Sequence, residues 1–442
     1  MIGDPPRKPE ILLGIHCKKM FAYKVRQDIS ITRMSTNSQE SWPFWKTVPR
    51  FEPEYSVTDF LRALAALIAR NNFEIVAFRQ FPADCLFFRS GRECLYAILK
   101  ALRLRDHARV GVPLYCCPSV FGAITAAGHM PVFLDVNLDT YSLDLDSLER
   151  NKNGLDAVVI VHTFGYPANL GAIRTCLGAK QIPMIEDCAH AFLSEYQGSL
   201  LGTHTQASFF SFGLHKPAAV GGGGVTVFND PTLAKSAAEV ISVPAAGSRL
   251  GELLHVVTCG VRALAYQRVI YGALLASPLG RRRDGRVSSD SEMLEDTSQY
   301  SLARMRQSDQ VLLGGRLDEF SEKLSILSRN AQKFRAAIQG VPLELPEEPS
   351  HGKWNHFLLP ARYRDGKCRT TGREFLTEHR VDTGPLYQNC VPGARHFGYS
   401  GGCPNAEKAA ETVCTIPHHP WLSDSEIESI GELVRRSTEF ET

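Results

Sequence analysis

The chain has 442 residues, of which 44% are hydrophobic and 22% charged, so it can fill the cores of roughly two to four domains and is not a disordered protein. Its 49 lysines and arginines stand against 47 aspartates and glutamates, and the resulting formal net charge of +2 gives no support to nucleic-acid binding. Twelve cysteines without any Cys-x-x-Cys pair predict reduced thiols in a cytoplasmic protein, with neither a disulfide scaffold nor a metal site.

Residues 1–48 are predicted to form a loosely ordered tail, because prolines, charges and a polar run over 35–41 dominate them. The first residues lack the long apolar core of a signal peptide, which agrees with a cytoplasmic location. From Asp59 onward, Phe60, Leu64 and Leu67 recur at helical spacing. We therefore expect a helix that leads into the first domain.

The next part of the chain alternates between short apolar runs and stretches of helical length. The runs lie at 109–112, 131–135, 157–161 and 182–185, and residues 169–179 are one of the intervening stretches. This alternation predicts an α/β domain over 49–245 with a mostly parallel central sheet and helices on both faces. Ligands of such sheets bind beyond the carboxyl ends of the strands.

A helical insertion is predicted over 246–300. Its apolar residues are interrupted by Arg262 and Arg268, which argues against a transmembrane helix, and a basic cluster follows at Arg281–Arg283. Two interpretations stay open: an insertion packed on its own protein or on a partner subunit, which we favour, and an amphipathic segment resting on an anionic membrane. Residues 301–442 are expected to form a smaller C-terminal α+β domain.

Three features carry chemistry. The apolar run at 182–185 leads into Asp187. This acid either lies at the edge of the sheet where ligands bind or caps a following helix. Lys216 follows a short strand at 208–212, where desolvation would lower the pKa of its amine and permit Schiff-base chemistry. Ser90 and Gly91 open an apolar helix whose free amides are suited to bind phosphate. Together, a phosphate cradle, an acid and a loop lysine are what pyridoxal 5′-phosphate (PLP) requires.

At this point the sequence resembles the DegT/DnrJ/StrS family of PLP-dependent sugar aminotransferases, which have the type I aminotransferase fold. The resemblance extends from about Thr47 to Glu432, and its Glu-Asp-x-Ala-His-Ala and Ser-Phe-x-x-x-Lys blocks are highly specific. The matching segments are Ser90-Gly91, Pro131–Val136, Asp139–Tyr141, His162–Pro167, Glu186–Ala191, Ser211–Lys216, Gly223-Gly224 and Ile416–Leu422.

The resemblance implies a role for each matched site residue. Lys216 would hold PLP and move the proton during catalysis, and Asp187 would pair with the pyridinium nitrogen. His190 would lie against the ring or bind its phenolic oxygen. The phosphate would be held by the Ser211 hydroxyl and by the start of the helix, which comprises Ser90, Gly91 and the backbone amides of Arg92 and Glu93.

The chain also departs from the family pattern. Arg92-Glu93 replaces the usual Thr-Ala, so a hydroxyl contact is lost and Arg92 is a candidate to add charge at the phosphate. Cys116 stands where relatives place an aromatic ring over the cofactor, so either this thiol or Tyr115 is expected to cover it. The cross-subunit asparagine of relatives is missing from Leu302–Met305. A family subgroup of dehydratases has histidine in place of the lysine, but counting from Ser211 assigns the position to Lys216 rather than His215.

We therefore expect a homodimeric aminotransferase that moves an amino group from an amino acid, usually glutamate in the family, to a keto group of a nucleotide-linked sugar, for polysaccharide or secondary-metabolite biosynthesis. Two alternatives stay open. One is a PLP enzyme of the same fold that acts on a non-sugar ketone or as a dehydratase. The other is a non-catalytic, membrane-associated scaffold. His162 is expected to be structural, and Tyr387 is equally suited to the cleft or the core.

Overall fold

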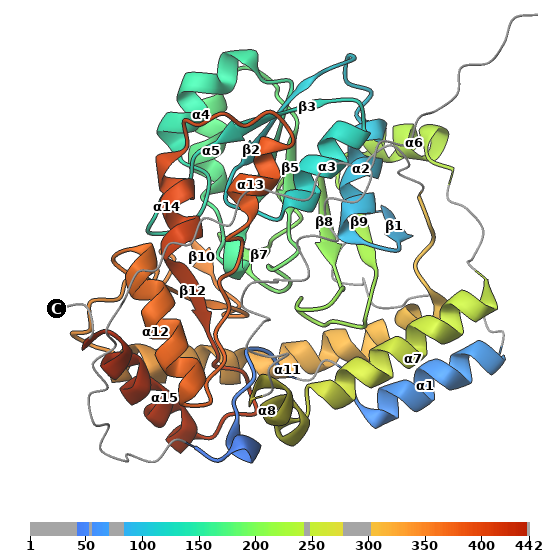
Figure 1. Cartoon of the computed structure of the whole chain (residues 1–442). Coiled ribbons are helices and arrows are strands. Elements are labelled where there is room, and N and C mark those ends of the chain that lie inside the picture. The colour runs from blue at the N-terminus through green and yellow to red at the C-terminus, as the bar shows by residue number, and fades with distance from the viewer. Residues whose placement is uncertain (1–41, 53–54, 70–83, 243–247, 277–301, 440–442) are drawn as a thin grey trace, which may run out of the picture. The chain divides into compact units, whose positions relative to one another are not determined.

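A seven-stranded sheet forms the centre of the computed structural model, which describes residues 42–52, 55–69, 84–242, 248–276 and 302–439 (Figure 1). In spatial order its strands are β1 (Asp84–Phe88), β9 (Gly224–Phe228), β8 (Ala207–Ser211), β5 (Met184–Asp187), β4 (Ala157–Val161), β2 (Arg109–Pro113) and β3 (Met130–Leu134). The five strands from β8 to β3 run parallel, whereas β9 is antiparallel to both of its neighbours. The predicted mostly parallel sheet is confirmed.

β-Branched residues dominate the central strand β4, whose sequence is Ala-Val-Val-Ile-Val. All five residues of β4 are buried, as expected for a central strand that is covered on both faces. The strand predicted at 182–185 lies two residues further on, because Pro183 has no N–H to donate to the ladder. This shift places Glu186 and Asp187 inside β5, hydrogen-bonded between β4 and β8.

Helices cover both faces of the sheet, as predicted. Alternate residues of β4 belong to two different cores: Val159 lies in the core with α2 and α3, and Val158 in the core with α5 and α11. The helices are η1 (Phe44–Lys46), α1 (Val57–Ala69), α2 (Gly91–Ala101), α3 (Pro118–Ala126), α4 (Leu145–Asn151), η3 (Lys152–Gly154), η4 (Thr163–Gly165), α5 (Leu170–Leu177), α6 (Pro231–Val240), α7 (Arg249–Ala265), α8 (Arg268–Ala276), α11 (Gln307–Ala337), α12 (Gly366–Glu378), α13 (Cys390–Arg395), α14 (Pro404–Thr412) and α15 (Asp424–Ser437).

The remaining described strands form two small sheets. β10 (Gly352–Lys353) pairs with the hairpin of β6 (Glu195–Tyr196) and β7 (Ser199–Leu200), and β11 (Leu359–Arg362) pairs with β12 (Val413–Ile416). The C-terminal region thus combines β11 and β12 with α12 to α15, in agreement with its α+β composition.

Ser41–Thr442 forms one compact unit, in which α1, α7 and α11 contact one another along the lower edge of Figure 1. Its ordered part begins before residue 49, because Val48 is fully buried and bridges to Val381. The domain limits at 245 and 300 stay predictions. Most of the predicted tail, to Ser41, and Arg281–Arg283 lie outside the described residues. No helix among the described residues combines the length and apolar content that crossing a membrane requires.

Candidate active site

Asp187 ends β5 at the carboxyl edge of the sheet. Its backbone pairs with Val161 of β4 and Phe209 of β8, which fixes the side chain's starting point. The Oδ1 atom accepts a hydrogen bond from Ala189 N at 2.9 Å, within a turn. No helix begins in residues 188–194, so the alternative that Asp187 caps a following helix is wrong. Burial raises the pKa of Asp187, and the nearby Lys216 charge counteracts part of that rise.

Lys216 reaches back from the loop after β8 to His190. The Lys216 Nζ atom lies 2.8 Å from His190 Nε2. Burial lowers the pKa of His190 well below its ordinary value of 6.5, and the Lys216 charge acts in the same direction. His190 is therefore neutral near pH 7, and its ring can accept a hydrogen bond from the lysine.

His215 has a different environment from its neighbour. Its ring stacks on Phe51 with the ring centroids 4.1 Å apart, and its Nε2 lies 3.3 Å from the Tyr266 hydroxyl. The lysine, and not the adjacent histidine, therefore contacts His190. This arrangement agrees with the assignment of the cofactor position to Lys216.

Tyr387 and Cys116 border the same group of residues. The Tyr387 ring is nearly parallel to that of His190, with an interplanar angle of 12°, and its hydroxyl lies 3.4 Å from His190 Nε2. Burial raises the pKa of the Cys116 thiol well above its ordinary value. Tyr115 instead donates to the Leu386 carbonyl at 3.0 Å and packs in the core. The Tyr115 ring also lies edge-on to that of Tyr387, with the ring centroids 5.5 Å apart, so both candidates for covering a cofactor stay open.

The start of α2 meets the end of β8. Ser90 is the N-cap of α2, and its hydroxyl accepts from the Glu93 amide at 3.4 Å. A Cβ added at Gly91 would lie 3.0 Å from Ser211 Cβ and 3.3 Å from its Oγ, so a larger residue would crowd the Ser211 side chain. The close approach puts a hydroxyl beside a helix N-terminus, a combination that suits a phosphate group.

The departures from the family pattern at the start of α2 have a structural explanation. The Glu93 carboxylate turns away from the helix and accepts from Ala303 N at 3.0 Å and from Arg89 N at 3.3 Å. Arg89 N also donates to the Ala303 carbonyl at 2.8 Å, so the Leu302–Met305 segment pairs alongside β1 of its own chain. The Glu93 amide, which the resemblance assigns to the phosphate, binds Ser90 in this structure.

These residues fit PLP. The cofactor needs an amine for its aldehyde, an acid for its ring nitrogen and donors for its phosphate. Lys216, Asp187 and the Gly91–Ser211 contact offer groups suited to these three functions at one edge of the sheet. The candidate site therefore brings together the residues that the sequence singled out.

A second layer of residues holds the site in place. Asn355, which the sequence analysis missed, donates to the His190 carbonyl at 2.8 Å and to the Phe192 carbonyl at 2.9 Å. The His162 Nε2 lies 3.2 Å from Glu186 Oε2, and its Nδ1 accepts from Ala168 N. Both ring nitrogens are thus engaged, which agrees with the prediction that His162 is structural.

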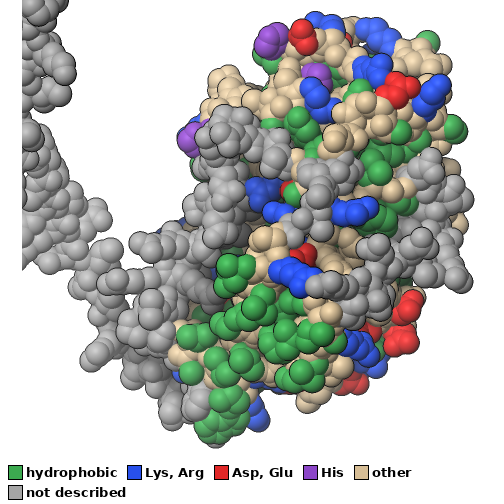
Figure 2. Space-filling view, turned by 90° about the vertical axis from the view of Figure 1, so that its right-hand side faces the viewer, with side chains coloured by type: hydrophobic (Ala, Val, Ile, Leu, Met, Phe, Trp, Pro, Cys, Tyr) green, Lys and Arg blue, Asp and Glu red, His purple; other side chains and the backbone are tan. Residues whose placement is uncertain are grey.

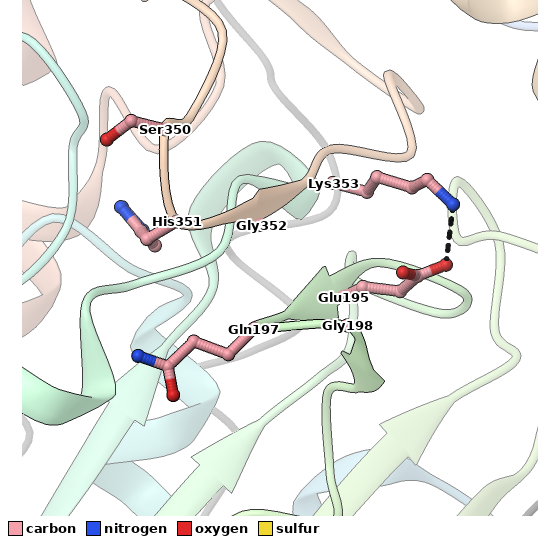
Figure 3. Close-up of a pocket in the computed structure, with 7 residues that line it drawn as sticks. All are labelled: Glu195, Gln197, Gly198, Ser350, His351, Gly352 and Lys353. Carbon is pink, nitrogen blue, oxygen red and sulfur yellow. Dashed lines mark hydrogen bonds and ion pairs between the residues drawn. The ribbon is translucent and has the colours of Figure 1, made fainter.

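A separate shallow pocket lies at the small sheet formed by β6, β7 and β10 (Figure 3). Its lining includes Glu195 and Lys353, whose side chains pair at 3.1 Å across the two strands. None of its lining residues belongs to the cluster around Lys216.

The fold and the site together define a type I PLP-binding fold, and comparisons with known proteins agree. The DegT/DnrJ/EryC1/StrS aminotransferase family matches residues 72–261 and 289–435. GDP-perosamine synthase of Escherichia coli O157:H7 is 33% identical over 145 residues, which are 33% of this chain and only 40% of that relative. The solved structure of Spr1654 of Streptococcus pneumoniae in its PLP form is 17% identical. The match covers 90% of this chain and 100% of Spr1654, with a TM-score of 0.67. DesI, solved in the presence of its TDP-sugar product, is 19% identical. The match covers 90% of this chain and 95% of DesI, with a TM-score of 0.66.

The chain therefore belongs to the DegT/DnrJ/EryC1/StrS aminotransferase family, whose cofactor is PLP. The solved structures, at identities below 25%, show the fold alone.

Proposed function

We propose that this protein transfers an amino group from an amino acid, with glutamate as the expected donor, to a keto group of a nucleotide-linked sugar. The observation that carries the proposal is the 2.8 Å contact between Lys216 and His190 beside the buried Asp187. The choice of acceptor is supported by the GDP-sugar in the name of one relative and the TDP-sugar bound to another. The aminated sugar would serve polysaccharide or secondary-metabolite biosynthesis.

Bound PLP supplies an electron sink for the electrons released at the substrate carbon. The Lys216 amine carries the proton away from that carbon and returns one in the second half-reaction. Asp187, as a carboxylate, keeps the ring nitrogen protonated. Neutral His190 and Cys116 are the candidates to border the ring, and Ser211 with the start of α2 would hold the phosphate.

The protein is further proposed to be a homodimer with its site near the interface, as in the family. The related alternatives, a dehydratase or an enzyme for a non-sugar ketone, differ from this proposal in product and not in cofactor. The intact Lys216 favours amino transfer over loss of water.

A product assay tests the proposal. Purified protein is incubated with PLP, glutamate and a panel of GDP- and TDP-linked 4-keto sugars, and products are identified by mass spectrometry. We expect an amino sugar and 2-oxoglutarate in equal amounts. The Lys353→Ala variant, which removes an exposed lysine paired with Glu195, should behave as the wild type, whereas Lys216→Ala should form no product. A dehydrated sugar, or amination of simple ketones only, would replace this proposal by one of the alternatives.

A further inference from the structure

Helix α7 turns its apolar stripe outward. At 100° per residue, the six residues of the stripe fall within an arc about 100° wide, the pattern of an amphipathic helix. Such a stripe normally faces the core, yet these side chains are 40% to 66% exposed. They are Leu250, Leu253, Leu254, Val257, Val261 and Leu264.

The inward face of α7 buries Val256 and Cys259 in the core and is also held by polar bonds. The buried Glu252 carboxylate accepts from Gln307 N and from Ser308 Oγ, both at 3.1 Å, at the N-terminus of α11. On the next turn, His255 Nε2 lies 2.7 Å from Asp309 Oδ1. These bonds fix the rotation of α7 about its axis, so the outward apolar stripe is the arrangement that the sequence specifies.

The stripe continues onto the neighbouring helices. Gly260 of α7 packs against the Phe60 ring of α1, where an added Cβ would lie 2.9 Å from the ring. On α1, Val57 is 71% and Ile68 77% exposed, and α8 adds exposed Val269, Ile270 and Leu274. Figure 2 shows hydrophobic side chains gathered in the lower part of the view, where α1 and α7 lie in Figure 1. We call the exposed surface of α1, α7 and α8 the outer face. A continuous apolar surface of this kind indicates a binding partner.

The charges on the outer face have one sign. Among the described residues of α1, α7 and α8, the exposed charged side chains are Arg62, Arg249 and Arg262. The acids of these helices are buried and engaged, Asp59 by Arg316 and Glu252 by α11. On the helical wheel Arg249 and Arg262 flank the apolar stripe on opposite sides. Arginines at the border of an apolar stripe can extend to anionic head groups while the stripe enters the lipid.

We propose that the outer face docks on an anionic membrane surface. The sequence analysis favoured packing on the protein itself or on a partner subunit. α7 does pack on its own protein through Val256 and Cys259, but the six residues of its apolar stripe stay exposed. A second copy is a poorer occupant, because a two-fold contact through the outer face would bring together two surfaces whose exposed charges are all positive, and such a surface is not complementary to itself. α1, α7 and α8 offer no exposed acid to pair with them. An anionic lipid surface matches both the apolar stripe and the positive charge.

Vesicle co-sedimentation of the full-length holoenzyme tests this inference. We expect binding to vesicles of phosphatidylcholine with about one third phosphatidylglycerol, binding that weakens with salt, and none to phosphatidylcholine alone. The Val257→Glu/Val261→Glu double variant should lose at least tenfold in binding. Met130→Glu, which alters an apolar side chain 49% exposed on β3, is the matched control and should bind as the wild type does.

Arg249→Glu/Arg262→Glu alters only exposed side chains, so it decides the matter even if the valine variant fails to fold. It should lose binding and keep enzymatic activity. Wild-type protein that stays in the supernatant with both vesicles would overturn the inference. A second result would also overturn it: a wild-type dimer that binds no vesicles and that the Val257→Glu/Val261→Glu substitutions convert to monomers. A second copy of the chain would then cover the outer face. The Lys216→Ala variant should bind vesicles normally, which separates this inference from the proposed activity.

Discussion

Two neighbouring carboxylates of β5 illustrate how position decides the role of a residue. Glu186 points into the core, where it accepts from Gly202 N at 2.9 Å, His204 N at 3.0 Å and the Thr205 hydroxyl at 3.1 Å, in addition to His162. Burial alone would raise the pKa of Glu186, but these bonds outweigh it and the pKa lies below the ordinary 4.5. Asp187, with fewer partners, keeps a raised pKa and remains available to a ligand.

Replacing Glu186 is predicted to affect stability. Glu186→Ala removes the acceptor of the Gly202 and His204 amides and of the His162 ring, so we expect a loss of about 3 kcal/mol in the free energy of unfolding, measured by urea denaturation at pH 7. Glu195→Ala breaks only a surface pair with Lys353 and should cost less than about 1 kcal/mol. Equal losses in the two variants would contradict the structural role of Glu186.

Replacing Asp187 is predicted to affect catalysis. Asp187→Asn keeps the shape of the side chain but removes the charge that holds the ring nitrogen protonated. We expect kcat to fall by about a hundredfold or more, while the variant folds and binds PLP. Undiminished kcat would remove Asp187 from the site.

At the scale of elements, the junction between α2 and β8 depends on a missing side chain. Gly91→Ala would push α2 away from Ser211, and we expect PLP to bind at least tenfold more weakly in a titration followed by absorbance. Gly314→Ala is the matched control: it lies in α11 with nothing within 4 Å of the added Cβ, and it should leave PLP affinity unchanged and stabilise the helix slightly. Similar PLP affinity in both variants would show that the junction does not hold the phosphate.

Helix α8 is held to the body through Asp382, which receives hydrogen bonds from the Tyr271 hydroxyl and, at 2.9 Å, from Arg50. Burial acts to raise the pKa of Asp382, but Arg50 outweighs it and the net pKa is below the ordinary 3.8. A carboxylate with a lowered folded-state pKa contributes stability above pH 4, and this contribution is lost as the pH falls through its folded-state pKa.

We therefore expect Tyr271→Phe to lower the free energy of unfolding by about 1.5 kcal/mol at pH 7. The difference from the wild type should shrink below pH 4, where Asp382 becomes protonated. Urea denaturation of both proteins at pH 7 and below pH 4 measures the free energies of unfolding. If the difference between variant and wild type did not depend on pH, the bond from Tyr271 to the Asp382 carboxylate would be contradicted.

The sequence predicted the elements of the site better than their surroundings. The period of the apolar residues predicted the strands, and the parallel topology then brought Asp187, Ser211 and Lys216 to one edge. Asn355 escaped prediction because it supports His190 from 165 positions away, a contact that only tertiary packing creates. Similarly, the spacing of apolar residues predicted the helices of the insertion but not that α7 turns its stripe outward. A period defines the faces of a helix, and the neighbouring polar bonds decide which face is buried.

For the whole molecule, the absorbance spectrum of the purified protein before and after glutamate is the most direct test of the account. We predict a yellow protein whose visible band is lost as glutamate donates its amino group. Lys216→Ala should lack both the band and the turnover while remaining folded, and Lys353→Ala should keep both. A wild-type protein that stays colourless with added PLP, or a Lys216→Ala variant that still transfers amino groups, would contradict the account.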